Sequence, residues 1–138
     1  MQLVDEQQVT SEVEVAARVL VAAFSNFDRD AYFGCFAPDA DFIFYNAPST
    51  FQSRTQYEDA WNEWVSDGWS VRACESVNPR IRVLDRDHAI FTHEVSTTLN
   101  TSDGESDMRE RETIVFVRQE GLWFAVHEHL SPLPTASN

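Results

Sequence analysis

The sequence predicts one α+β domain in which helices come first and a long, curved antiparallel sheet follows. Apolar residues recur at helical spacing as far as Gly68, whereas from Trp69 onward they alternate with polar residues as in strands. The length of 138 residues suits a single hydrophobic core. The sequence contains no internal repeat and no low-complexity linker, so we expect residues 1–138 to form one domain.

The first helix is expected from Glu6 to Phe24. Asp5 and Gln8 have the spacing of a capping box, and Val4 and Val9 can form the hydrophobic staple around it. The apolar stripe of this helix consists of Val9, Val13, Ala17, Leu20 and Phe24.

A short second helix is expected after Asp28, which can cap it, and Pro38 should end it because proline cannot continue a helix. Its apolar positions are Ala31, Tyr32, Cys35 and Phe36. The apolar segment from Phe42 to Tyr45 then predicts a strand.

The third helix begins after Ser53, which forms a second capping box with Gln56, and Gly68 ends it. One face of this helix carries Tyr57, Ala60, Trp61, Trp64 and Val65.

Alternation after Gly68 predicts four long strands joined by tight turns. In the first, Asn78-Pro79 should introduce a kink or bulge before the chain continues to the turn at residues 85–87. The residues expected on one face of it are Trp69, Val71, Ala73 and Val77. The remaining strands are residues 88–100, 107–118 and 122–130, and residues 131–138 are expected to be a frayed tail.

Composition limits the partners. Acidic residues outnumber basic ones 23 to 10, for a net charge of -13, so nucleic acid and anionic membrane are poor partners. The polar N-terminus is unlike a signal peptide, and Cys35 and Cys74 are far apart, which predicts free buried thiols in a reducing cytoplasm. The sequence lacks a calcium loop, a phosphate loop and a dinucleotide fingerprint, so we expect no cofactor.

Two stretches carry a resemblance to a known family: VNPRIRVLDRDHAI from Val77 to Ile90, and RERETIVFVRQEGLWFAVHEHLSPLP from Arg109 to Pro134. They resemble the association (hub) domain of calcium/calmodulin-dependent protein kinase II and its stand-alone bacterial relatives, within the nuclear transport factor 2-like (SnoaL-like) superfamily. Over residues 1–68 the resemblance is architectural. It implies a cystatin-like cone, in which the N-terminal helices pack in a strongly curved mixed or antiparallel sheet with a pocket at the open end. It also implies a homodimer formed through the outer face of the sheet.

The resemblance also indicates which residues face the pocket. The three arginines of the hub pocket fall on Val95, Ile114 and Leu130, and its acidic position falls near Tyr45, so the positive charges are missing here. Alternation from these positions turns further residues inward, namely Phe91, His93, Glu112, Phe116, Phe124, Val126 and Glu128. With residues of the helices, the expected ligand-binding set is Tyr45, Tyr57, Trp61, Phe91, Val95, Ile114, Phe116, Val126 and Leu130.

Glu112, Glu128 and His93 are the catalytic candidates. A carboxyl group among apolar side chains has its charged form disfavoured, which raises its pKa toward the range useful for acid–base catalysis. Ketosteroid isomerase, on the same fold, uses such carboxyls, although its catalytic aspartate falls near Tyr45, where this chain has no carboxylate. The structural alternative is that each glutamate pairs with Arg72 or Arg82 or lies at a solvated rim, and that His93 is a neutral, half-buried histidine.

His127 and His129 share one strand face at a spacing that could hold a metal ion. Alternation places them on the outer face with Trp123 and Ala125, opposite two arginines of the neighbouring strand, Arg109 and Arg111. We interpret them as interface histidines and expect no metal.

Three classes of function remain open at this stage. The first is a homodimer that binds a small, mostly apolar molecule. The second is a cofactor-free acid–base enzyme of the isomerase, dehydratase or polyketide cyclase type. The third is an oligomerisation module without a ligand, and the fold alone cannot choose among them.

Overall fold

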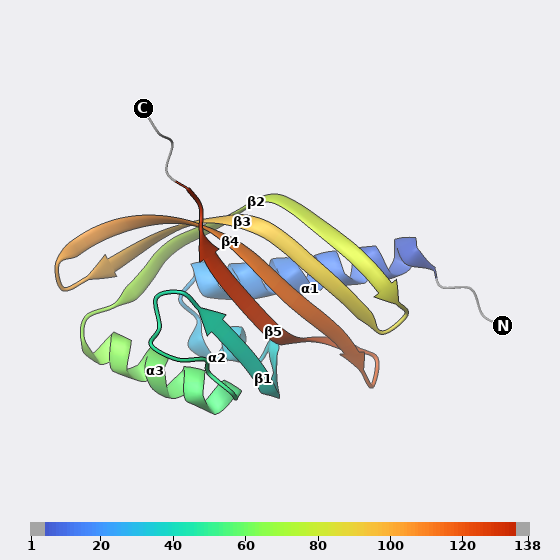
Figure 1. Ribbon diagram of the computed structural model, residues 1–138, viewed down its shortest axis with the longest axis horizontal. Coiled ribbons are helices and arrows are strands. Elements are labelled where there is room, and N and C mark those ends of the chain that lie inside the picture. The colour runs from blue at the N-terminus through green and yellow to red at the C-terminus, as the bar shows by residue number, and fades with distance from the viewer. Residues whose placement is uncertain (1–4, 135–138) are drawn as a thin grey trace.

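The computed structural model describes residues 5–134, in which helices lie against the concave face of a curved, five-stranded sheet (Figure 1). The helices are α1 (Glu6–Ser25), α2 (Arg29–Phe33) and α3 (Arg54–Ser66). The strands are β1 (Phe36–Phe44), β2 (Ser70–Asp85), β3 (His88–Thr101), β4 (Gly104–Gln119) and β5 (Leu122–Pro132). Their order in the sheet is β1-β5-β4-β3-β2, with β1 parallel to β5 and the other pairs antiparallel. The predicted α+β class and the helix-first order are confirmed.

Helix α1 begins as the sequence predicts. The Asp5 side chain accepts a hydrogen bond from the Gln8 backbone N–H at 3.0 Å, which satisfies one free N–H group of the first turn. The capping box is not completed, because the Gln8 side chain donates to Glu12 instead. Val4, the outer half of the expected staple, lies outside the described residues. The buried stripe is Val9, Val13, Ala17, Leu20 and Ala23, and it packs against the sheet.

The segment after α1 differs from the prediction. Asp28 does cap α2, but the helix ends at Phe33, and β1 already begins at Phe36. Pro38 therefore lies inside a strand and does not terminate a helix. β1 is at the edge of the sheet, where a residue without an N–H is tolerated, and its register against β5 shifts between Phe36 and Asp41. The expected helical positions of Cys35 and Phe36 are wrong for this reason.

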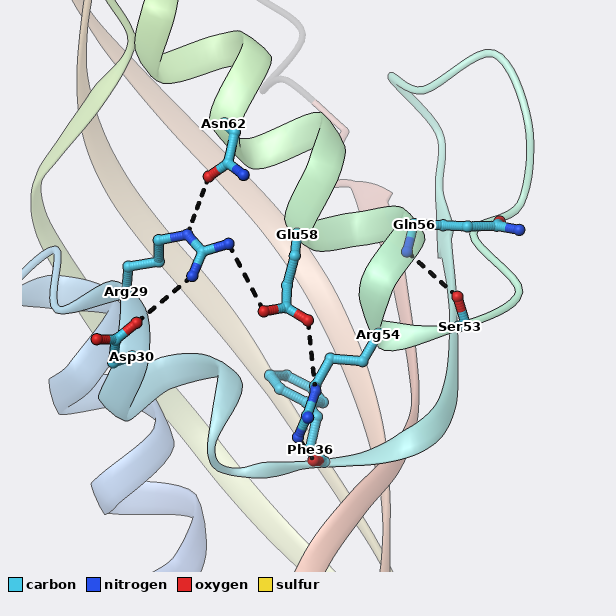
Figure 2. Close-up of polar contacts among 8 residues, drawn as sticks. All are labelled: Arg29, Asp30, Phe36, Ser53, Arg54, Gln56, Glu58 and Asn62. Atoms are coloured by element: carbon cyan, nitrogen blue, oxygen red, sulfur yellow. Dashed lines mark hydrogen bonds and ion pairs between the residues drawn. The ribbon is translucent and has the colours of Figure 1, made fainter.

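Helices α2 and α3 are held together by polar contacts on their outer side (Figure 2). Arg29 of α2 donates to Asn62 at 3.0 Å and lies 3.6 Å from Glu58, both on α3. Glu58 also lies 3.5 Å from Arg54, whose guanidinium donates to the Phe36 carbonyl at 3.0 Å. This set of contacts fixes α2 relative to α3 and to the start of β1.

The start and end of α3 agree with the prediction. The Ser53 hydroxyl accepts a hydrogen bond from the Gln56 backbone N–H at 3.2 Å (Figure 2). Gly68 follows the helix with φ +100, a left-handed conformation that a residue with a side chain rarely adopts. The predicted helix boundaries are confirmed.

Three register shifts against β3 interrupt β2, the last of them between Val83 and Asp85 beside the turn. The first is a register shift between Val71 and Ala73, after which Cys74 and Ser76 turn inward and Ala73 is exposed. The expected placement of Ala73 and Val77 on the same face as Val71 is therefore wrong. The second lies at Asn78, where φ is +54 and the register against β3 shifts again. The predicted bulge at Asn78-Pro79 is confirmed.

A bulge in β5 changes which side chains face the helices. Val115 pairs with His127 but the next residue of β4, Phe116, pairs with Ala125, so Val126 is an extra residue. Ala125 is fully buried, and Trp123 lies on the inner side, where its indole N–H donates to Glu12 of α1 at 2.8 Å. The expected inward positions of Phe124 and Val126, and the outward positions of Trp123 and Ala125, are wrong.

The ends of the strands are longer than expected. Ser131 and Pro132 belong to β5 and pair with Arg111 and Glu110 of β4, so they are not part of a frayed tail. Residues 135–138 lie outside the described part of the chain. Cys35 and Cys74 are free thiols. Within residues 5–134, no helix is long and apolar enough to cross a membrane.

Candidate functional site

Three neighbouring strands bring ionisable side chains together on the inner face of the sheet. His93 of β3 is directly opposite Glu112 of β4, and Glu112 is diagonal to Glu128 of β5, whose partner is Ile114. All three ionisable side chains are buried, with exposed fractions of 4%, 9% and 2% respectively. The predicted inward orientation of His93, Glu112 and Glu128 is confirmed, whereas their roles remain predictions.

These side chains form a continuous line of hydrogen-bonding groups, which we call the polar chain. At one end Ser76 Oγ lies 2.6 Å from His93 Nδ1, and His93 Nε2 lies 2.7 Å from Glu112 Oε1. Glu112 and Glu128 share a side-chain hydrogen bond. At the other end the Tyr32 hydroxyl lies 3.4 Å from Glu128 Oε1 and 3.0 Å from the Tyr57 hydroxyl. The members of the polar chain are Ser76, His93, Glu112, Glu128, Tyr32 and Tyr57.

The two glutamates share one proton. Burial raises the pKa of Glu128 well above its usual range, and the negative charge of Glu112 raises it further. Burial also raises the pKa of Glu112, but its hydrogen bond with Glu128 acts in the opposite direction. Two buried carboxyl groups in contact do not both ionise readily, and the stronger upward shift of the Glu128 pKa favours a proton on Glu128 with Glu112 as the carboxylate.

The remaining titratable members of the polar chain are neutral near pH 7. Burial lowers the pKa of His93 to about 4, and only an ionised Glu128 would act in the opposite direction. Burial raises the pKa values of Tyr32 and Tyr57 well above their usual range, and ionisation of Glu128 would raise both further. The tyrosines are therefore phenols that can donate hydrogen bonds, and His93 is an imidazole with one free lone pair.

The polar chain borders a cavity with two parts. The inner cavity has a volume of about 50 Å³ and is lined by side chains that include His93, Glu112, Glu128 and Tyr32. The outer part, which we call the vestibule, has a volume of about 300 Å³ and includes Phe44, Trp64 and Met108. Both parts are lined by Phe24, Tyr57, Thr97, Glu110 and Leu130. A few water molecules or the tip of a ligand fit the inner cavity, whereas the vestibule is large enough for a ring.

A third carboxyl group stands where the two parts meet. Glu110 is buried, and its Oε2 accepts a hydrogen bond from the Tyr45 hydroxyl at 2.7 Å. Burial raises the pKa of Glu110, against the effect of this hydrogen bond, and burial together with Glu110 raises the pKa of Tyr45 to about 12. None of the residues that line either part is an arginine, so in the described part of the chain no cation faces a ligand there.

The predicted ligand-binding residues fall into two groups. Tyr57, Val95 and Leu130 line the cavity, and Tyr45 reaches its edge through Glu110. Trp61, Ile114 and Phe116 are instead buried in the hydrophobic core, Phe91 lines a separate groove, and Val126 occupies the bulge of β5. The latter group lines neither part of the cavity.

Sequence reasoning missed several residues of the site, namely Tyr32, Cys74, Ser76, Thr97 and Glu110. Thr97 and Glu110 continue the inward alternation of β3 and β4, so the period could have identified them. Cys74 and Ser76 face inward only because of the bulge near Arg72, which leaves no clear sequence signal.

The structural alternative for the glutamates is partly wrong. Arg72 pairs with Glu105, at the start of β4, at 2.8 Å. The described partners of Glu112 and Glu128 are His93, Tyr32 and each other. Both carboxyl groups are buried and do not lie at a solvated rim.

His127 and His129 lie on the outer face, as predicted, with ring centroids 6.2 Å apart. Their expected alignment with Arg109 and Arg111 is wrong, because the register places Thr113 and Val115 opposite them. His127 Nδ1 lies 2.7 Å from Asp41 of β1. Within residues 5–134, no three or more histidine, cysteine or acidic side chains are grouped so that they could hold a metal ion.

Solved structures with the same fold are numerous. A protein from Xanthomonas campestris, provisionally assigned as a calcium/calmodulin dependent protein kinase II association domain, has a TM-score of 0.75 at 23% identity and covers 91% of this chain and 88% of its own. A nuclear transport factor 2-like protein from Salmonella enterica has a TM-score of 0.80 at 16% identity over 96% of both chains. A protein from Novosphingobium aromaticivorans, provisionally assigned as a scytalone dehydratase, has a TM-score of 0.79 at 12% identity and covers 94% of this chain and 87% of its own.

At these identities the similarity establishes the fold alone. No curated protein matches the chain. The family model described as the SnoaL-like domain matches residues 13–136, which is most of the sequence. The chain therefore belongs to the SnoaL-like domain family, within the nuclear transport factor 2-like superfamily that the sequence stretches at residues 77–90 and 109–134 predict.

Proposed function

We propose that this protein binds a neutral, ring-sized molecule in the vestibule and moves a proton on it without a cofactor. The observation that carries the proposal is the pair of buried glutamates, Glu112 and Glu128, which share a hydrogen bond, with His93 Nε2 2.7 Å from Glu112. General acid–base catalysis requires an acid and a base held side by side, and burial raises the pKa values of both carboxyl groups toward neutral pH.

The ligand class follows from the charges and the volume. An anionic ligand would meet the carboxyl groups of Glu110 and Glu112 with no arginine in the cavity lining to compensate, so carboxylates are disfavoured. A neutral ring fits the 300 Å³ of the vestibule among Phe44, Trp64 and Leu130. Its carbonyl or hydroxyl oxygen would enter the inner cavity, where protonated Glu128 and the phenol of Tyr57 can donate hydrogen bonds.

In this arrangement Glu128 is the general acid and Glu112, with His93, accepts a proton from carbon or oxygen of the substrate. The net reaction is an isomerisation, a loss of water or a cyclisation, in which no electron acceptor is needed. The structural neighbour provisionally assigned as a dehydratase is compatible with this reaction class, although the similarity concerns the fold.

Binding without turnover is the second candidate, and the size of the inner cavity favours it. With about 50 Å³ beside the glutamates, only the tip of a ligand reaches them unless side chains move. The protein would then be a carrier or sensor of the same class of neutral molecule.

Two measurements test the proposal in sequence. Thermal shift with neutral polycyclic ketones and alcohols should show stabilisation, whereas matched carboxylates should show little; stabilisation by carboxylates alone would contradict the ligand class. Ketones that bind are then incubated in D₂O, and exchange of the proton next to the carbonyl is followed by NMR. Exchange that Glu112→Gln or Glu128→Gln slows by at least about a hundredfold supports catalysis. Binding with no exchange in the parent protein supports the carrier.

The predicted homodimer belongs to the same proposal, with the outer face of the sheet as the contact surface. The side chains His127, His129, Glu94 and Arg109 lie on this face, and Arg109 is 3.9 Å from Glu94. We expect a dimer that buries more than about 1,000 Å² in total. Light scattering that shows a monomer at micromolar concentration would exclude it. We place the protein in the cytoplasm, where the free thiols Cys35 and Cys74 would stay reduced.

A further inference from the structure

A second hollow lies between α1 and β2, and we call it the α1–β2 groove. Its volume is about 570 Å³, and its walls are mainly apolar. The residues that form them include Ala17, Val21, Ala22, Pro79, Ile81 and Phe91. Arg18 and Glu14, an ion pair at 2.8 Å, lie at its rim. Ser76 also lines this groove, and it lines neither the inner cavity nor the vestibule.

Ser76 is the end of the polar chain that reaches the groove. Its Oγ lies 2.6 Å from His93 Nδ1, and the other ring nitrogen of His93 lies 2.7 Å from Glu112. A hydroxyl, an imidazole and a carboxylate are thus in line, each within hydrogen-bonding distance of the next. This is the arrangement by which serine hydrolases activate their nucleophile.

The direction of the hydrogen bonds follows from the charges. Glu128 holds the shared proton, so Glu112 is a carboxylate that can only accept. His93 must then donate its Nε2–H to Glu112, which leaves the Nδ1 lone pair for the hydroxyl proton of Ser76. Because the ring is neutral, it can take up that proton. If Glu112 carried the proton instead, Nδ1 would be the donor and Ser76 would not be activated.

We infer that Ser76 is a nucleophile for neutral esters whose apolar acyl group lies in the α1–β2 groove. Ser76 Oγ forms a bond to the ester carbonyl carbon while its proton passes to His93 Nδ1. The bond from that carbon to the alcohol oxygen breaks, and the proton is returned to the departing alcohol. Water then attacks the acyl-serine by the same route, releases the carboxylic acid and restores Ser76. Glu112 is a positioning residue, which holds the His93 tautomer and stabilises the imidazolium.

The test uses an alkyl fluorophosphonate, which replaces its fluoride with a serine oxygen, and p-nitrophenyl butyrate as the ester. We expect the full-length protein to gain one phosphonyl group on the peptide that contains Ser76, and to release p-nitrophenol. Ser76→Ala should abolish the label at this peptide. Ser96→Ala, which removes an exposed serine of β3, should label like the parent. No label, or a label at another residue, would overturn the inference.

A second pair of variants tests the positioning role. Glu112→Gln can donate to His93 and reverse its tautomer, so labelling should slow by at least about a hundredfold. Glu94→Gln, next to His93 in sequence but on the opposite face, should label at the rate of the parent. Circular dichroism confirms that both variants fold. If Glu112→Gln labels as fast as the parent, the proposed role of Glu112 is wrong.

The pH dependence of the labelling rate distinguishes activation of Ser76 by His93 from labelling of a serine that is merely exposed. The titratable side chains that line the inner cavity with His93 are Cys74 of β2, Glu110 and Glu112 of β4, Glu128 of β5, Tyr32 of α2 and Tyr57 of α3. Burial lowers the pKa of His93 to about 4, so labelling should persist to about pH 5 and fall below it. A rate that rises only with hydroxide concentration would mean that His93 does not act as the base. The inference shares His93 and Glu112 with the proposed function, but the label is read out at Ser76, which lines neither part of the cavity, so a missing label and a missing ligand in the vestibule are distinct failures.

Discussion

Two buried clusters lie side by side in this protein and are built in opposite ways. The first is the Trp61 cluster, in which Trp61 is 1% exposed and its ring lies 4.8–6.2 Å from the rings of six neighbours. These neighbours are Phe24, Phe27, Tyr32, Phe33, Tyr57 and Trp69. The second is the polar chain, which shares Tyr32 and Tyr57 with the first.

The two clusters differ in their contribution to stability. Burial of the Trp61 cluster stabilises the fold, whereas the polar chain is held in place at a cost in stability. Aromatic burial is favourable in itself, and edge-to-face ring contacts add to it. Burying Glu112, Glu128 and His93 is unfavourable, and hydrogen bonds offset that cost only in part. The Trp61 cluster therefore accounts for stability, and the polar chain calls for a functional explanation.

The largest effect is expected at Trp61. Trp61→Ala should lower the free energy of unfolding by about 3–5 kcal/mol, because a fully buried ring leaves a cavity that its neighbours cannot fill. Trp64→Ala, in the same helix but only partly buried, should cost clearly less. Urea unfolding measures both, and equal losses would mean that the cluster is not centred on Trp61.

The next effect is a pH dependence that belongs to the polar chain. The pKa of His93 is lowered to about 4 in the folded protein, so between pH 6.5 and 4 the unfolded chain binds a proton that the folded one does not. Stability should therefore fall with decreasing pH, by up to about 1.4 kcal/mol per pH unit from this group. The glutamates, whose folded pKa values are raised, act oppositely: their contribution is present below about 4.5 and is lost as the pH rises.

The difference between the parent and His93→Gln isolates the histidine. Urea unfolding at several pH values in this range should give a steeper loss for the parent toward low pH. Parallel curves for the two proteins would mean that the folded pKa of His93 is not lowered. Trp61→Ala serves as the control, since it removes no titratable group.

A smaller effect is expected where the two clusters meet. Tyr32→Phe keeps the ring in the Trp61 cluster but removes the hydroxyl that contacts Glu128 and Tyr57. The loss should be about 1–2 kcal/mol, as for an unmade buried hydrogen bond. Tyr45→Phe, whose parent residue is 45% exposed, should cost less. A Tyr32→Phe protein as stable as the parent would show that its hydroxyl contributes nothing to the polar chain.

The smallest effect is expected on the outer side of α2 and α3. Glu58 lies between Arg29 and Arg54 at 3.6 and 3.5 Å, but its side chain is 24% exposed (Figure 2). Glu58→Gln should therefore cost less than about 1 kcal/mol, and the cost should shrink at high salt. A larger, salt-independent loss would mean that the contacts of Glu58 are required to position α2 and α3, and with them Tyr32 and Tyr57.

The two clusters also differed in how far the sequence could predict them. Helical spacing placed Tyr57 and Trp61 on one face, because regular elements repeat with a fixed period. Alternation turned His93 and Glu112 inward once the family resemblance had placed Val95 and Ile114 in the pocket. The positions of the local bulges could not be predicted from a fixed period. The residue types Asn78-Pro79 indicate a bulge, whereas the bulges near Arg72 and at Val126 arise from pairing with neighbouring strands. Ser76, Trp123 and Ala125 were misassigned or missed for this reason.

The extra residue in β5 shifts the alternation of inner and outer side chains by one position along that strand. On one side of Val126 the inner positions are Trp123 and Ala125, and on the other side they are Glu128 and Leu130. Removing this one residue would restore regular alternation along the whole strand. One half of the strand would then have to exchange its inner and outer side chains. A deletion of Val126 would thus turn Glu128 toward solvent or Ala125 out of the core, although neither residue is itself altered. In distant relatives, an alignment that misses a one-residue gap here would compare pocket residues with surface residues.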